Sequence, residues 1–177
     1  MSLAFASAWA APVAAARIAV GLILAHAAYG KLRDAAVFRG VVHAYRLLPD
    51  RLADALAAVL PPVEAGLAAL LIAGVLAPLP GLAAALLLAV FAGAIGINVA
   101  CGRTEIDCGC FRGAAPQRIG WGLVGRNFGL AALALLAAVP VRGNLAAFAQ
   151  GAGAGVSLSL VFLTINTLPQ ARRRARA

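Results

Sequence analysis

The chain is organised as long apolar runs separated by short polar segments. A helix needs about 20 residues to cross the hydrocarbon core of a bilayer. Five apolar runs reach about that length, at roughly residues 8–30, 61–79, 80–100, 119–140 and 145–168. Glycines dilute the last run, which makes it the weakest of the five spans. The pattern predicts one all-α membrane domain over residues 1–177, built as a four-helix transmembrane bundle with a fifth helix added.

A polar segment separates the first two spans. Its second half, about residues 50–60, places Leu52, Leu56 and Leu60 on one helical face. Asp50 is suited to the N-cap of such a helix, because its side chain accepts hydrogen bonds from free backbone N–H groups. We expect a short amphipathic helix here, lying at the membrane surface and ending at the Pro61-Pro62 start of the second span.

The composition supports a polytopic membrane protein. Apolar residues make up 63 % of the 177 and charged residues only 12 %, whereas soluble domains have about 45–50 % and about 25 %. These values exclude a soluble globular domain and a disordered chain. The net charge of +9 is due to arginines between the apolar runs and in the tail, where topology signals and lipid contacts are placed, so we expect no nucleic-acid partner. No basic segment follows Met1, so we expect no cleavable signal peptide.

The distribution of basic residues predicts an orientation. The loops after the first and third spans and the C-terminal tail are basic, whereas the opposite side has only Arg142. The basic residues of the two loops are Lys31, Arg33, Arg39, Arg46, Arg51, Arg103, Arg112 and Arg118. The positive-inside rule therefore puts these loops and the tail on the cytoplasmic side of a bacterial plasma membrane, with the N-terminus outside.

All three cysteines, Cys101, Cys108 and Cys110, fall in one loop at residues 101–118. A metal site normally needs four ligands, and this loop contains no histidine, so we expect no metal. Thiol–disulfide exchange needs only an attacking and a resolving sulfur. Gly109 lets the backbone bend between two nearby cysteines, and nearby arginines favour the thiolate. Redox chemistry is the favoured interpretation, and a static structural disulfide is the alternative.

Polar side chains within the spans are expected to gather beneath this loop, because all lie near span ends on its side. They are His26, Tyr29, Glu64, Asn98, Arg126 and Asn127. Charges in lipid are costly, so Glu64 is expected to pair with Arg126, with Arg17 as the competing partner. The cluster is either a structural clasp or a polar pocket that positions the loop or hydrogen-bonds a quinone head group. We expect no covalently bound cofactor.

Several short motifs resemble the MauE family of methylamine-utilisation membrane proteins, within the wider DoxX-like group. The resemblance covers about residues 14–135 and is most specific at the cysteines and the Arg-Asn pair after them. The motifs are Gly30-Lys31-Leu32, Tyr45-Arg46-Leu47-Leu48-Pro49, Pro62-Val63-Glu64 with Gly66-Leu67, Asn98, Asp107-Cys108-Gly109-Cys110-Phe111 and Arg126-Asn127. One departure is Arg112, because a glycine more often follows the Phe in the family.

The resemblance implies a four-helix membrane core, often with an added helix. It also implies a role in maturing the disulfide-rich small subunit of methylamine dehydrogenase, alongside a thioredoxin-like partner, with Cys108 and Cys110 as the redox pair and Cys101 as a possible third member. Electrons would pass to a membrane quinone or a second dithiol. Oxidation of an exported client requires the loop outside, in conflict with the arginine count, so the side stays open. Two alternatives are a non-catalytic assembly or anchoring factor with a structural disulfide, and a small-molecule carrier built on Glu64 and Arg126.

Overall fold

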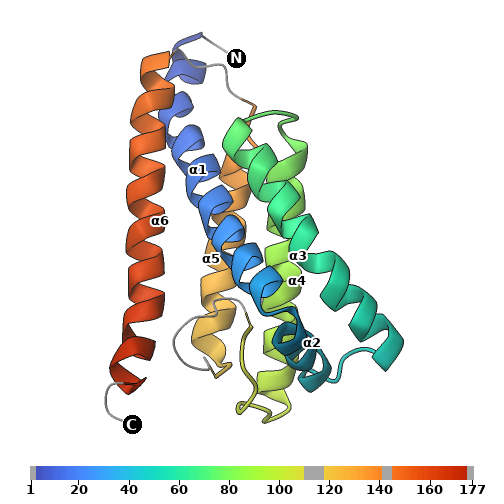
Figure 1. Ribbon diagram of the computed structural model, residues 1–177. Helices are drawn as coiled ribbons and strands as arrows, with labels where there is room; N and C mark the ends of the chain where they lie inside the picture. Colours follow the sequence, from blue (N-terminus) through green and yellow to red (C-terminus); the bar gives the residue numbers. More distant parts are fainter. Residues whose placement is uncertain (1–2, 110–117, 141–144, 175–177) are drawn as a thin grey trace.

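Over the residues that it describes, the computed structural model is an all-helical bundle of six helices, shown in Figure 1. It describes residues 3–109, 118–140 and 145–174, with side chains from 9 to 109, 118 to 140 and 145 to 166. The helices are α1 (Leu3–Arg33), α2 (Ala35–Ala44), α3 (Asp50–Ala73), α4 (Leu79–Ala100), α5 (Trp121–Ala137) and α6 (Leu145–Arg174). The five longer helices alternate in direction, while α2 lies at the end of the bundle where α1 stops. The expectation of an all-α polytopic membrane fold is confirmed.

Four helices are long and apolar enough to span a membrane, at Trp9–Arg33, Asp50–Ala73, Leu79–Ala100 and Leu145–Asn166. The fifth run is therefore a genuine long helix. In contrast, α5 is shorter than the predicted span, with 17 residues, or about 25 Å at 1.5 Å per residue. At the C-terminal end of α5, the Arg17 side chain of α1 satisfies backbone carbonyl groups. It donates hydrogen bonds to the carbonyls of Ala137 and Val139 at 2.9 and 3.0 Å.

The prediction of a separate amphipathic helix at residues 50–60 is wrong. Residues 50–60 are the first half of α3, which continues through Pro61 and Pro62 to Ala73. Two prolines remove two helical N–H donors, but packing keeps the helix continuous, since Ala57 and Leu60 are buried against Phe38 of α2. The short helix between the first two spans is α2 instead. Figure 1 shows the first half of α3 leaning away from α4, with α2 beside it.

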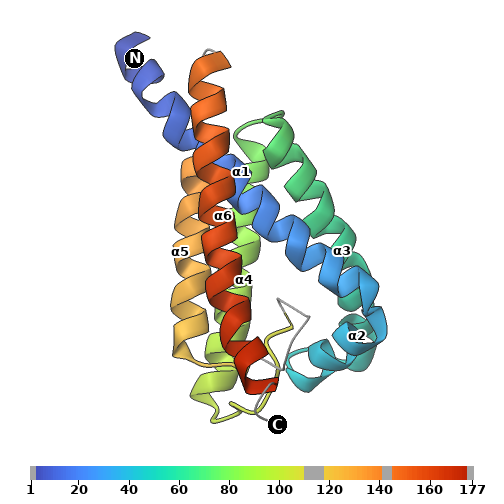
Figure 2. The same ribbon diagram turned by 60° about the vertical axis from the view of Figure 1, so that its left-hand side comes forward.

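The core lies between α1, α3, α4 and α5 and contains small and branched apolar side chains, such as Val20, Leu24, Leu88 and Ala134. Helix α6 packs against α1, and Figure 2 shows the two helices crossing each other. Its Gly151 and Gly155 sit against the α1 backbone, so that an added Cβ would lie 2.5 Å from the carbonyl oxygen of Ala11 and 2.6 Å from that of Ala15. Small residues at this spacing allow two membrane helices to approach closely.

Candidate functional site

The cysteine loop leaves the bundle at the end of α4 and returns at α5, and its two arms meet in a narrow neck. Asp107 and Arg118 form an antiparallel bridge, and the N–H of Ile119 donates to the carbonyl of Ile106 at 3.0 Å. The exposed side chain of Arg118 also forms an ion pair with Glu105, with 2.8 Å between the charged atoms. The neck fixes where the chain turns toward Cys108.

Gly109 lets the loop fold against α2. Its φ of +69° lies in the left-handed region, which disfavours other residues. A Cβ here would lie only 2.8 Å from Cγ1 of Val41. The Asp107 carboxylate accepts a hydrogen bond from the Gly109 N–H at 3.2 Å. Asp107 and Gly109 therefore act together to place Cys108, which is buried with Ile95 and Ile119.

Arg126 of α5 points at Cys108. Its Nη2 donates to the Cys108 sulfur at 3.7 Å, and its Nη1 donates to Oδ1 of Asn166 in α6 at 3.0 Å. The Asn166 amide is itself oriented, because its Nδ2 donates to the carbonyl of Phe162 at 2.8 Å. A guanidinium held beside a sulfur stabilises the thiolate over the thiol.

The prediction that Glu64 pairs with Arg126 is wrong, and so is the prediction that Arg17 is the competing partner. Glu64 is paired with Lys31 near the end of α1, and both side chains are almost completely buried. The Lys31 ammonium also lies 5.3 Å from the ring centre of Phe38 and 5.1 Å from that of Phe91. The pairing follows from helix order, since α3 packs against α1 and α4, while α5 packs against α4 and α1.

An apolar cavity of about 110 Å³ lies between α2, α3 and α4, and both Lys31 and Cys108 line it. We call it the Lys31–Cys108 cavity. Its walls are otherwise almost entirely apolar and include Phe38, Leu60 and Phe91. It therefore joins Lys31 of the buried ion pair and the buried cysteine in one space.

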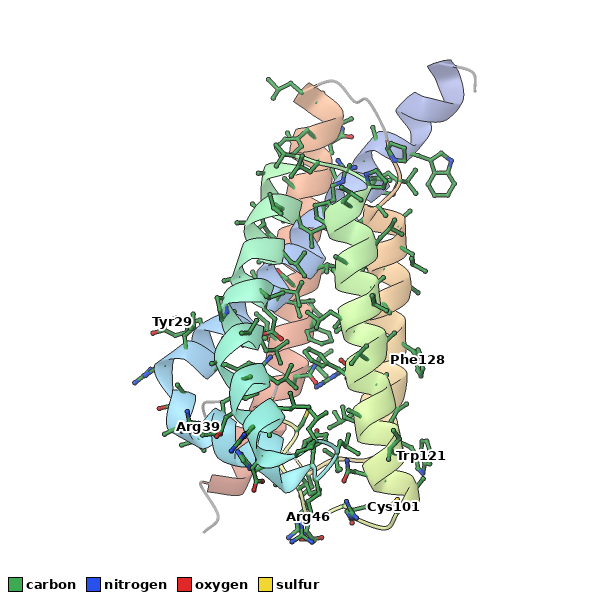
Figure 3. All side chains as sticks on the ribbon, turned by 90° about the vertical axis from the view of Figure 1, so that its right-hand side faces the viewer. Tyr29, Arg39, Arg46, Cys101, Trp121 and Phe128 are labelled. Atoms are coloured by element: carbon green, nitrogen blue, oxygen red, sulfur yellow. The ribbon has the colours of Figure 1, made fainter. Side chains whose placement is uncertain are left out.

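The other predicted site residues are only partly brought together. Asn98 and Asn127 are buried, but their Nδ2 atoms donate within their own helices, to Ala94 and Leu123. His26 is half-buried on α1. Tyr29 is 63 % exposed and points away from the bundle in Figure 3, so it does not reach the cavity.

Cys101 is exposed at the end of α4, and Figure 3 shows it at the end of the bundle that carries the cysteine loop. Cys110 lies outside the described residues, as does the rest of the loop from 111 to 117. Among the residues with described side chains, no three His, Cys, Asp or Glu gather as metal ligands.

Known proteins share much of the sequence of this chain, including the cysteine loop. The family described as methylamine utilisation protein MauE matches residues 8–140, which contain α2 to α5, almost all of α1 and the cysteine loop. The chain belongs to the MauE family. The similarity to the family expected from the short motifs is thereby confirmed.

Curated MauE proteins are similar over most of their length. The Methylamine utilization protein MauE of Paracoccus denitrificans is 46 % identical over 160 residues, covering 87 % of this chain and 85 % of that protein. The MauE protein of Methylorubrum extorquens is also 46 % identical, covering 80 % and 78 %. That of Methylophilus methylotrophus is 40 % identical, covering 86 % and 83 %. No solved structure gives a significant match.

Sequence reasoning missed three parts of this MauE-family site. It counted Lys31 as a basic residue of the first loop and gave it no ion-pair partner, although Glu64 in the next span was a signal that Lys31 had one. It gave no role to Asn166, which is a polar residue within the last span. It also gave little weight to His43 of α2, which bonds Asp54 of α3 at 2.9 Å.

His43 lies between two carboxylates of α3. Its second ring nitrogen is 3.4 Å from Asp50, and Arg39 contacts Asp54 at 3.3 Å. The hydrogen bond to Asp54 raises the pKa of His43 above its ordinary value. This cluster ties α2 to α3 and so helps to close one side of the Lys31–Cys108 cavity.

Proposed function

We propose that this MauE-family protein is a membrane thiol–disulfide relay that serves methylamine utilisation, with Cys108 as its central thiol. The observation that carries the proposal is the contact between Arg126 and the Cys108 sulfur. A cysteine that only fills space needs no cation beside it, whereas an exchanging cysteine needs its thiolate stabilised. The long apolar helices support a place in a bacterial plasma membrane. The proposed reactive end of the bundle is the end beside α2.

In the proposed reaction, a client thiolate attacks the disulfide formed by Cys108 and a second loop cysteine, Cys110 by the family resemblance. Attack on the partner sulfur breaks the S–S bond, forms a mixed disulfide and releases Cys108 as a thiolate facing Arg126. A second client thiol then displaces the loop cysteine. The client gains a disulfide, and two electrons with two protons arrive on the pair.

The clients we propose are a thioredoxin-like protein or a cysteine-rich protein such as the small subunit of methylamine dehydrogenase. Cys101 is exposed at the end of α4. In the proposed relay, it exchanges with the Cys108–Cys110 pair from the side that the client protein approaches. Electrons would leave the pair to a membrane acceptor or to a second dithiol protein.

The test is a serine series in cells grown on methylamine, with Cys108→Ser, Cys110→Ser and Cys101→Ser. We expect Cys108→Ser to abolish disulfide formation in the small subunit while the protein still accumulates in the membrane. Cys101→Ser serves as the matched control and should have a smaller effect. Intact client disulfides in Cys108→Ser cells would contradict the relay and leave the anchoring function.

The same cells settle the side of the loop. If the relay oxidises exported clients, a membrane-impermeant maleimide should label Cys108 and Cys110 before lysis, and only after reduction. Labelling confined to lysed cells would place the loop in the cytoplasm, in agreement with the arginine count. The relay would then carry reducing equivalents from cytoplasmic thiols.

A further inference from the structure

The Lys31–Cys108 cavity is open toward apolar surroundings. Leu47, Leu48 and Leu56 line it and are about 40 % exposed, with values of 40, 43 and 40 %. These leucines form a mouth in a membrane protein at the end where α3 leans away from α4. A ligand that enters between them has to tolerate lipid, and a charged soluble molecule would lose its hydration there.

Inside the cavity, Lys31 keeps donor capacity that no residue of the described ranges uses. An ammonium has three N–H donors, and Glu64 accepts from one of them. The rings of Phe38 and Phe91 lie near the same nitrogen but offer only their π faces. Oε2 of Glu64 is buried and has no hydrogen-bond partner within the described part of the chain. A clasp with only a structural role would leave fewer polar groups of this pair unsatisfied.

We propose that this cavity binds the ring of a membrane-soluble quinone, which is the electron acceptor for Cys108. The Lys31 ammonium donates a hydrogen bond to one carbonyl oxygen of the ring, and Phe38 and Phe91 flank the ring. Glu64 is a positioning residue that holds Lys31 in place. An apolar quinone tail leaves through the leucine mouth. This inference rests on the proposed relay function, because it names the acceptor for the same thiol.

The chemistry balances without a further reactant. Two thiols, on Cys108 and its partner cysteine, give one disulfide with the loss of two electrons and two protons. The quinone takes up both electrons and both protons and leaves as hydroquinone. A lipid acyl chain in the same cavity would bury the Lys31 donors without satisfying them, and it accepts no electrons.

Binding is tested with ubiquinone-1 on the purified full chain in lipid nanodiscs. Cys108→Ser should bind it as the wild type does, since the ring contacts are intact. Ala94→Phe puts a ring into the cavity and should abolish binding, whereas Ala83→Phe, at an exposed position of the same helix, should not. Lys31→Met combined with Glu64→Met should weaken binding by about tenfold, roughly what one hydrogen bond to a charged group contributes.

A second measurement separates this inference from the relay itself. Ubiquinone-1 added to the reduced wild type should yield one hydroquinone for each disulfide formed, and Ala94→Phe should stop this while a dithiol client still exchanges with Cys108. No binding by the wild type, or equal binding by Ala94→Phe, would overturn the quinone site and leave the relay standing. Quinone reduction that persists in Cys108→Ser would instead overturn the role of Cys108.

Discussion

The two ends of the bundle are held together by different kinds of contact. At the end opposite the cysteines, backbone meets backbone, as where Gly151 and Gly155 of α6 lie against α1, and Arg17 donates to two main-chain carbonyls. At the cysteine end, polar side chains meet each other or a sulfur around a cavity, as with Arg126 and Cys108.

The contrast between Arg17 and Arg126 shows how the same residue type serves two purposes. The Arg17 guanidinium satisfies carbonyls at the end of the short α5, so it stabilises the fold. The Arg126 guanidinium is directed by Asn166 to a sulfur that can change its charge. The end opposite the cysteines is held by contacts to backbone atoms, and the cysteine end holds the groups suited to chemistry.

The largest effect on stability is expected from breaking the buried ion pair. Glu64→Ala leaves the Lys31 charge buried without a partner and should lower the free energy of unfolding by about 3–5 kcal/mol. Lys31→Met with Glu64→Met should recover most of this loss, because no lone charge remains. Denaturant titration in micelles measures both. A loss in the double variant as large as in Glu64→Ala would show that the pair itself is not the cause.

Tight backbone packing at the opposite end gives the next effect. Gly155→Ala places a Cβ 2.6 Å from the carbonyl oxygen of Ala15 and should cost about 1–3 kcal/mol through overpacking. Gly153→Ala is the matched control, since nothing lies within 4 Å of its Cβ position. It should be neutral or slightly stabilising. Equal losses in the two variants would contradict the close approach of α6 to α1.

A smaller effect is expected where the cysteine loop meets α2. Gly109→Ala combines a left-handed backbone with a clash against Val41. Gly102→Ala has a similar φ of +75° and open space, so it isolates the backbone cost of about 1–2 kcal/mol. Gly109→Ala should lose more stability than Gly102→Ala and should also slow disulfide exchange. Identical behaviour would mean that the loop does not depend on its contact with α2.

The smallest effect is expected from pH. His43 has a raised pKa in the folded protein because it bonds Asp54, so its stabilising contribution is complete below the unfolded histidine pKa of about 6.5. That contribution disappears as the pH rises through the folded value. His43→Gln should therefore reduce stability at about pH 5.5 and much less at about pH 9. Unfolding curves at both values check this, and a loss that grows with pH would contradict it.

The sequence was sufficient for the broad architecture, because apolar runs and loop positions determine which polar residues share one end. It was not sufficient for the pairing of Glu64, since that depends on which helices are neighbours, and α3 lies against α1. The course of α3 was missed for a similar reason. Prolines at residues 61 and 62 resemble a helix start, but α3 is continuous and packs on α2 just before them. Tyr29 has the expected depth but faces outward, a rotation that residue spacing alone did not indicate.

The proposed relay depends most on Arg126 activating Cys108, and alkylation kinetics test this directly. The measurement uses Cys101→Ser with Cys110→Ser, so that Cys108 is the single cysteine, and a small alkylating reagent at about pH 7 and about pH 10. Arg126→Met should slow the reaction about tenfold at the lower pH and little at the higher pH, where the thiol ionises unaided. Arg17→Met should leave the rate unchanged at both. Equal rates at neutral pH with and without Arg126 would show that Arg126 does not activate Cys108.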